Sequence, residues 1–503
     1  MPHVRSPLFL LILATYLVAG GLYAWLTPAW QAPDEPAHYN YVHYLVTNPD
    51  FPQLAANCYN QAYLNELTSR RFPPDLSIDP LCYEFHQPPL YYLLGLPLFV
   101  LSDGWLPLLR FLSMAILGGG VVGLSFLIAR SIFPDRPVIM YGAMALVAFT
   151  PMHLTMLASV NNDALAELIL AVILLFLTER LVCHTDPTQH SRYFQSDLRL
   201  GVLLGLGLVT KTTVYIAIPL IAVVLWLTSR SANCNPHFRY DWRKLARQAF
   251  VVYGLALLIA LPWYVRNVVM YGGFDILGLV RHDRVVVGQL RTADYIAQVG
   301  LVTYLGEFVK VTFESFWGQF GWMAVPLPSW IYSLLTALTL TALVGLVALW
   351  RGNRTLAATL SSGQRQALAL LALNAALMAL GYIWYNLTFV QFQGRYLFPA
   401  LIPLGVFFAL GLHEVLSLHW WRWLAGSLGI VLIGVTVITA WQGDLDRLGM
   451  LLIGLALAGV VGRAWLARYR LIPTSWLMAA CYSVLALVTL VSPFWFIVPH
   501  LSP

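Results

Sequence analysis

Apolar runs of about 20 residues recur along nearly the whole chain, and this pattern constrains the fold more than any other feature. Each run is long enough, as a helix, to cross a hydrocarbon core of roughly 30 Å. In lipid, backbone N–H and C=O groups must pair within the protein, so the runs are predicted to be helices. Only 10% of the 503 residues are charged, against roughly a quarter in soluble domains. We therefore expect an all-α polytopic membrane protein.

The Lys and Arg residues predict the orientation, because cytoplasmic loops are enriched in them. The loop at 30–88 contains seven acidic residues and only two arginines, so it is expected outside the cytoplasm. A second large outer loop is expected at 270–329. Alternation of the basic inner loops gives about 13 transmembrane helices, with the C-terminus outside. These short basic loops also account for the net charge of +6, which does not indicate a nucleic-acid partner.

The segment at 88–103 does not fit this alternation. It is apolar, but it is short and interrupted by proline. If it crossed the membrane, every later helix would reverse and the basic loops would lie outside. We interpret it as an interfacial or re-entrant helix, with a full span as the alternative.

Two of the five cysteines, Cys58 and Cys82, lie in the first outer loop. A disulfide between them would close a loop of about 25 residues and contribute about 3 kcal/mol. The extracytoplasmic compartment permits such a bond. Two unpaired thiols are the alternative.

Ionisable residues gather at the predicted outer ends of the runs, where charge is costly and usually functional. The set comprises Asp34, Glu35, His86, Asp163, Lys211, Arg266 and Arg395. Asp34 and Glu35 are the predicted catalytic residues, because a carboxylate can accept a proton from a hydroxyl nucleophile. The other five are predicted to bind the donor phosphate or the substrate, because cations can neutralise a phosphate that leaves with developing charge. A site at the membrane surface suits a substrate with a lipid tail and a polar head. This combination predicts glycosyl transfer from a lipid phosphate.

Several segments resemble motifs of the GT-C membrane glycosyltransferases, which include bacterial aminoarabinose transferases and relatives of the protein O-mannosyltransferases. QAPDEPAHYNYV is similar to their early motif, and HQPPLYYLLGLPLF to their H-P-P-L-Y segment, which an arginine-led helix follows. GLGLVTKTTV resembles their glycine-rich turn with lysine, and LPWYVRNVVMYG their L-P-W-x-x-R-N stretch. SFWGQFGW and VQFQGRYLFP are closer to a less characterised bacterial branch. The resemblance predicts a catalytic module at 1–400, which includes both outer loops, and assigns no role to the helices at 401–503.

The resemblance implies an inverting enzyme of the inner membrane that uses a polyprenyl-phosphate sugar donor at the extracytoplasmic face. Asp34 matches the catalytic carboxylate of the first outer loop, and Lys211 matches the lysine that meets the lipid-linked phosphate. Asp163 aligns with an acid of the second loop near the active site. His86 departs from the aminoarabinose pattern, in which a lysine precedes the prolines. Some members require a divalent metal, but the first loop lacks a D-x-D motif, so no cofactor is expected here.

Two other functions stay open at this point, a transporter or flippase for lipid-linked sugars and a non-GT-C ligase or polymerase. The clustering of polar groups at one face disfavours a transporter, because transporter sites lie near the bilayer midplane. Simpler roles also exist for single residues. Asp34 could cap a helix, Lys211 could snorkel to the interface, and Arg266 could anchor a helix at the membrane surface. The sugar could be a hexose or a pentose, and the acceptor a glycan, a lipid or a protein.

Overall fold

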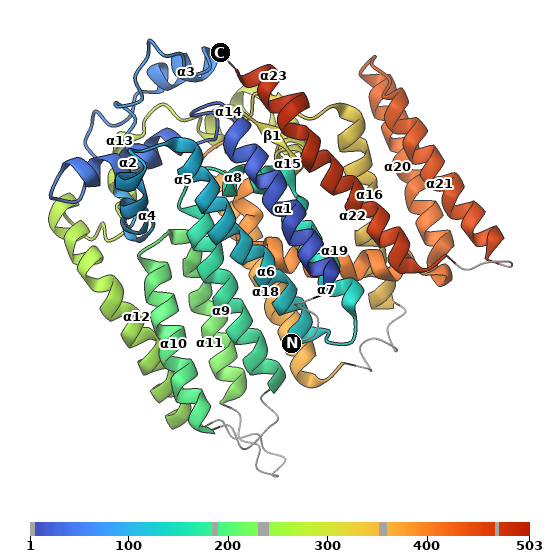
Figure 1. Cartoon of the computed structure of the whole chain (residues 1–503), viewed down its shortest axis with the longest axis horizontal. Coiled ribbons are helices and arrows are strands. Elements are labelled where there is room, and N and C mark those ends of the chain that lie inside the picture. The colour runs from blue at the N-terminus through green and yellow to red at the C-terminus, as the bar shows by residue number, and fades with distance from the viewer. Residues whose placement is uncertain (1–5, 184–189, 230–240, 352–359, 468–471, 503) are drawn as a thin grey trace.

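The computed structural model describes residues 6–183, 190–229, 241–351, 360–467 and 472–502. Within these residues nine helices are long and apolar enough to cross a membrane, or up to eleven if each of two bent pairs is one span. The nine are Pro7–Leu26, Leu106–Ile132, Trp242–Tyr271, Ser329–Leu349, Ser362–Asn386, Gly394–Val415, Trp421–Trp441, Arg447–Leu466 and Thr474–Leu501. The chain is therefore an all-α, multi-pass membrane protein, as predicted (Figure 1).

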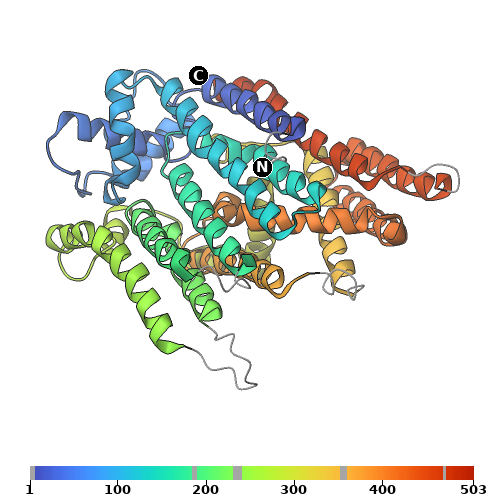
Figure 2. The same cartoon turned by 60° about the horizontal axis from the view of Figure 1, so that its bottom comes forward.

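The helices that form the centre and flanks of the bundle follow the apolar runs of the sequence. In the N-terminal half they are α1 (Pro7–Leu26), α5 (Leu106–Leu112), the π-helical turn η3 (Ser113–Gly118), α6 (Gly119–Ile132), α9 (Asp163–Cys183), α10 (His190–Leu208), the 3₁₀ turn η5 (Thr212–Ile216), α11 (Ala217–Thr228) and α12 (Trp242–Tyr271). In the C-terminal half they are α16 (Ser329–Arg351), α18 (Ser362–Asn386), η6 (Gly394–Ala400), α19 (Leu401–Val415), η7 (Leu418–Trp420), α20 (Trp421–Trp441), α21 (Arg447–Leu466), α22 (Thr474–Ser492), η8 (Pro493–Ile497) and α23 (Val498–Leu501). The hairpin α20–α21 lies at the opposite end of the molecule from α10–α12 (Figures 1 and 2).

The number of candidate spans is lower than the expected 13, although every predicted span is helical. Helices α9 and α10 carry several charged side chains, and α11 is only 12 residues long. These three helices therefore fall short of the length and apolarity that a lone membrane-spanning helix needs. Their charges are tolerated because they pair inside the protein, as Arg180 of α9 does with Asp197 of α10 at 2.6 Å.

A bend of 64° separates α7 (Pro137–Phe149) from α8 (Pro151–Leu157). Pro151 has no N–H, so it cannot donate to the carbonyl of Val147 four residues earlier. The Nδ1 of His153 lies 2.9 Å from that oxygen and takes the place of the missing donor. The Nε2 of the same ring lies 2.8 Å from Glu167 on α9. This buried bridge fixes the bend, which directs the chain after α8 toward the polar end of the bundle.

The first outer loop contains α2 (Glu35–Thr47), α3 (Gln61–Ser69), η2 (Tyr83–His86) and then α4 (Leu90–Leu101). Helix α4 has 12 residues, which at 1.5 Å per residue cover about 18 Å, far less than a bilayer core. It is therefore not a full span, in agreement with the interfacial interpretation. Cys58 and Cys82 form the predicted disulfide, and the N–H of Cys82 donates to the carbonyl of Cys58 at 3.1 Å.

The second outer loop is largely helical. It contains α13 (Leu279–Val285), α14 (Thr292–Val299) and α15 (Leu301–Trp317), followed by an antiparallel pair of two-residue strands, β1 (Gln319–Phe320) and β2 (Val325–Pro326). Helices α14 and α15 together have the length and apolarity of a span but are bent by 116°. This pair was not anticipated as a candidate membrane segment.

The first outer loop and the C-terminus lie on the same side of the protein, as predicted. The Nη1 of Arg71 donates to the carbonyl of Ser502 at 2.8 Å. The C-terminal end of α23 lies beside α3, whereas α1 begins on the opposite side of the bundle (Figure 1). The polar residues described below gather at this C-terminal side of the bundle.

Candidate active site

Asp34 lies between α1 and α2, where the chain turns sharply. Its backbone has φ 67° and ψ −8°, a left-handed conformation that Asp adopts more readily than most residues. Its carboxylate forms an ion pair with Arg395, with Oδ2 and Nη2 2.7 Å apart. The hydroxyl of Tyr83 donates to the other oxygen at 3.0 Å. Two segments far from Asp34 in the sequence therefore hold this carboxylate.

The environment of Asp34 keeps its carboxylate ionised. Burial acts to raise the pKa of Asp34. The positive charge of Arg395, the nearby His38 and the two hydrogen bonds outweigh this effect, and the pKa is lowered overall. The side chain is still 25% exposed, whereas that of Arg395 is 7% exposed. The carboxylate is thus charged at neutral pH and accessible from one side.

Asp34 and Arg395 line a cavity of about 290 Å³ together with Glu84. The rest of the wall is rich in amide and phenol groups, from Tyr59, Gln61, Gln289, Tyr385, Gln391 and Tyr396. These groups can donate and accept hydrogen bonds, as a ligand with many hydroxyl groups requires. One oxygen of Glu84, Oε2, is buried and has no hydrogen-bond partner among the described residues.

Arg395 is positioned by the chain on both sides of it. Its Nε donates to Gln393 at 2.6 Å, and its Nη1 lies 3.8 Å from the sulfur of Met156. Gly394 permits this arrangement, because a Cβ at that position would lie 2.3 Å from the carbonyl oxygen of Thr312 on α15. The guanidinium group is therefore fixed independently of Asp34.

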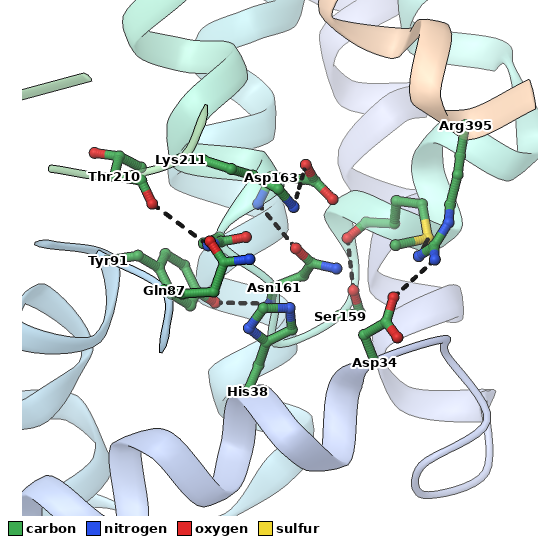
Figure 3. A network of polar contacts seen from close by, with 12 residues as sticks. Asp34, His38, Gln87, Tyr91, Ser159, Asn161, Asp163, Thr210, Lys211 and Arg395 are labelled. Atoms are coloured by element: carbon green, nitrogen blue, oxygen red, sulfur yellow. Dashed lines mark hydrogen bonds and ion pairs between the residues drawn. The ribbon is translucent and has the colours of Figure 1, made fainter. Parts of the chain in front are cut away.

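A second ion pair lies next to the first, although its two residues do not line the cavity. Lys211 follows the end of α10, and its Nζ lies 2.7 Å from Oδ1 of Asp163 at the start of α9. The side chains are 17% and 24% exposed, respectively. In Figure 3, Ser159 and Asn161 lie between this pair and the Asp34–Arg395 pair.

The turn at 158–162 between α8 and α9 is held from several directions. The N–H of Asn161 donates to the hydroxyl of Tyr91 at 3.0 Å, and the Oδ1 of Asn161 accepts the N–H of Asp163 at 2.9 Å. The side chain of Asn162 donates to Gln87 at 3.3 Å and to the carbonyl of Thr210 at 3.4 Å. The turn thus ties the first outer loop to the segment that carries Lys211, which brings the two ion pairs to one place.

Comparison with known structures identifies the fold. The chain is similar to the crystal structure of ArnT from Cupriavidus metallidurans bound to undecaprenyl phosphate, with a TM-score of 0.53 and 15% identity over 96% of this chain and 77% of that one. The chain has a GT-C fold. The apo structure of the same ArnT gives a TM-score of 0.51 and 16% identity over 96% and 76% of the two chains.

An oligosaccharyltransferase of Archaeoglobus fulgidus is also similar, with a TM-score of 0.47 and 15% identity over 96% of this chain and 56% of that chain. No family model matches the sequence, and no curated protein matches it. The likeness in fold to ArnT covers 96% of this chain at 15% sequence identity.

Within this GT-C fold, Glu35 lies outside the cavity. Its carboxylate is fully buried and accepts from Nε of Arg110 at 2.7 Å and from Nη2 at 2.5 Å. It also accepts the N–H of Val160 at 3.1 Å. Arg110 in turn donates to the carbonyls of Thr27 and Pro28. The pair joins α1, α2, α5 and the turn before α9, and this geometry does not support the predicted catalytic role of Glu35.

His86 and Arg266 also lie outside the cavity that Asp34 and Arg395 line. Burial lowers the pKa of His86 to about 3, so the ring is neutral and offers no charge to a phosphate. Its Nδ1 lies 3.0 Å from the carbonyl of Tyr83. Arg266 donates to the carbonyl of Pro52 and lies over the ring of Trp263 at 4.7 Å, so it ties α12 to the first outer loop. Both residues therefore have structural partners in place of the predicted contact with phosphate.

Three groups around the cavity were not singled out from the sequence. Tyr59 and Tyr83 line the wall, and His38 is buried on α2 with its Nδ1 2.7 Å from the hydroxyl of Tyr92. A signal for the tyrosines exists, because each follows a cysteine of the disulfide directly. The bond that closes the loop thereby also places both phenols on the cavity.

The described residues contain no group of three or more His, Cys, Asp or Glu side chains arranged to hold a metal ion. Asp34 and Asp163 are instead paired with Arg395 and Lys211, respectively. Whether the reaction needs a metal stays a prediction from the sequence.

Proposed function

We propose that the protein is an integral-membrane inverting glycosyltransferase that moves a sugar from a polyprenyl-phosphate donor to an extracytoplasmic acceptor. The main support is the ionised, partly exposed Asp34, which is paired with Arg395 and faces a polar cavity at one end of a membrane-spanning bundle. The pair of Lys211 and Asp163 lies nearby (Figure 3). The fold is that of an ArnT whose structure contains undecaprenyl phosphate. Site and fold thus favour the same substrate class.

In the proposed reaction, Asp34 acts as general base. It takes the proton of an acceptor hydroxyl, whose oxygen attacks the anomeric carbon from the face opposite the phosphate. The bond between that carbon and the phosphate oxygen breaks, and the bonding electrons leave with the polyprenyl phosphate. Arg395 and Lys211 stabilise the negative charge that develops on the leaving oxygen. A positioned base of this kind contributes roughly a hundred- to ten-thousand-fold in rate.

The proposed location is the inner membrane, with the cavity at the extracytoplasmic face. The scarcity of Lys and Arg in the loop at 30–88 supports this orientation. Labelling of cysteines introduced at Ser77 with an impermeant reagent in intact cells tests it. Protection of that position would place the cavity in the cytoplasm.

The decisive experiment uses the purified full chain in lipid nanodiscs with synthetic undecaprenyl-phosphate-linked hexoses and pentoses. Release of undecaprenyl phosphate, measured by mass spectrometry with a panel of glycan, lipid and peptide acceptors, is the expected result. The Lys211→Ala variant should weaken donor binding by about 10- to 150-fold, because a charge-assisted contact contributes roughly 1.5–3 kcal/mol. Movement of an intact donor between leaflets without cleavage would instead identify a flippase.

A further inference from the structure

Both cations assigned to phosphate binding are already neutralised. Arg395 is paired with Asp34 and Lys211 with Asp163, each at 2.7 Å. Carboxylate and phosphate oxygens make the same kind of charge-assisted contact with Arg and Lys. A phosphate that approaches either cation therefore has to compete with a carboxylate of the protein.

We propose that the carboxylates of Asp34 and Asp163 compete with the donor phosphate for Arg395 and Lys211 and are displaced by it. The two residues then set the affinity for the donor, and Asp34 is freed to act as base only when donor is bound. This inference rests on the proposed function. Both carboxylates then have a second role, as competitors of the substrate.

In the pair of Asp34 and Arg395, the carboxylate can leave while the cation stays. Arg395 keeps its contacts to Gln393 and Met156 when its Nη2 loses Asp34. The backbone of Asp163 is held by Asn161, so only its carboxylate has to turn away. Asp34 and Asp163 are 25% and 24% exposed, which allows a displaced carboxylate to find solvent or substrate. The buried pair of Arg110 and Glu35, at 2% and 0%, offers no such exit.

Displacement of Asp34 from Arg395 also raises the basicity of its carboxylate, which favours its role as general base. The charge of Arg395 is the largest influence that lowers the pKa of Asp34 in the ion pair. A phosphate that takes over Arg395 neutralises this charge and adds a negative one nearby, and both effects make the carboxylate more basic. Tyr83 still donates to Asp34 and keeps it oriented.

The first test measures binding of undecaprenyl phosphate to the purified full chain, by tryptophan fluorescence. Asp34→Asn and Asp163→Asn each remove a competing charge and leave its cation in place. Each is expected to bind at least about tenfold more tightly than the wild type, the lower end of a charge-assisted contact. Asp75→Asn is the matched control, because Asp75 forms an exposed pair with Arg70 at 2.8 Å outside the cavity, and its affinity should equal that of the wild type.

Binding by Asp34→Asn and Asp163→Asn no tighter than by the wild type would overturn the inference and leave the proposed function standing. If the wild type itself fails to bind undecaprenyl phosphate, the proposed function fails as well. Melting curves confirm folding, and the two variants test the two pairs separately, so the loss of one variant to misfolding leaves the other decisive.

The second test compares two pH profiles of the wild-type transfer reaction. The decrease of kcat/KM at low pH reports the pKa of the base in the free enzyme. The decrease of kcat at low pH, its acid limb, reports the pKa of the base in the donor complex. Because the base must be ionised, activity falls as the pH drops through the pKa of Asp34. The inference requires this fall to occur at lower pH in kcat/KM than in kcat. Coincident limbs, or the reverse order, would contradict it.

Discussion

Asp34 and Glu35 are neighbours in the sequence, and each forms an ion pair with an arginine from a distant segment. Glu35 is fully buried and its pair with Arg110 is surrounded by further hydrogen bonds, whereas Asp34 is one-quarter exposed and faces a cavity. The residue types and distances are nearly the same in the two pairs. The difference teaches that access for a ligand, more than chemistry of the side chains, separates a structural ion pair from a candidate catalytic one.

The sequence could predict what depends on composition and order along the chain. The apolar runs predicted the helices, and the charge of the loops placed the first outer loop and the C-terminus on one side. The shared compartment of Cys58 and Cys82 was enough to suggest their disulfide. These features need no knowledge of which helix packs on which.

The partners of the charged residues could not be predicted in the same way. Glu35 was predicted to be catalytic together with its neighbour Asp34. It lies one residue further along the chain, in the first turn of α2, and its side chain points toward Arg110, 75 positions away. His86 and Arg266 likewise have partners that only the tertiary structure reveals. Such pairings depend on helix packing, and several alternatives are compatible with one sequence pattern.

The largest expected effect separates the two carboxylates by activity. Asp34→Asn keeps size and hydrogen bonding but cannot accept the proton, so transfer per folded molecule should fall roughly a hundred- to ten-thousand-fold. Glu35→Gln should instead lower the yield of folded protein and leave turnover of the folded fraction much closer to the wild type. Transfer assays normalised to folded protein by size-exclusion chromatography measure both. Near-wild-type turnover by Asp34→Asn would leave Asp34 with a structural role only, as the ion-pair partner of Arg395.

The second prediction concerns the contribution of the buried pair of Arg110 and Glu35 to the stability of the protein. Arg110→Met removes one partner of a fully buried pair and leaves the charge of Glu35 unpaired, which costs about 3–5 kcal/mol. Thermal unfolding should therefore shift strongly downward. The double variant Arg110→Met with Glu35→Gln carries no unpaired charge and should recover much of the loss. If Arg110→Met alone unfolds like the wild type, Arg110 and Glu35 do not form the structural pair described above.

A third prediction concerns the first outer loop, which contacts the accessible ion pair of Asp34 and Arg395 through Tyr83. Replacing Cys58 and Cys82 by serine removes a cross-link between residues 24 apart and should lower stability by about 3 kcal/mol. The wall formed by Tyr59 and Tyr83 should loosen with it, so KM for the donor or acceptor should rise more than kcat falls. A reducing agent should reproduce the effect in the wild type and change nothing in the double variant. Equal melting temperatures with and without the reductant in the wild type would show that the bond is unimportant.

The smallest expected effect tests the accessible pair without breaking it. The hydroxyl of Tyr83 donates to Asp34 at 3.0 Å and helps to lower the pKa of that carboxylate. Tyr83→Phe removes this donor and leaves Arg395 in place, so the pKa of Asp34 should rise. The effect should be the smallest of those predicted here, because solvent weakens the influence of one hydrogen bond on a partly exposed carboxylate.

The sign of the shift follows from the requirement for an ionised base. Activity is lost as the pH falls through the pKa, so the acid limb of kcat/KM for Tyr83→Phe should lie at higher pH than that of the wild type. Tyr59→Phe is the matched control, because Tyr59 also lines the cavity but donates to Gln61 instead of Asp34. Its acid limb should coincide with that of the wild type. An unchanged limb in Tyr83→Phe, or an equal shift in both variants, would mean that the limb does not report the ionisation of Asp34.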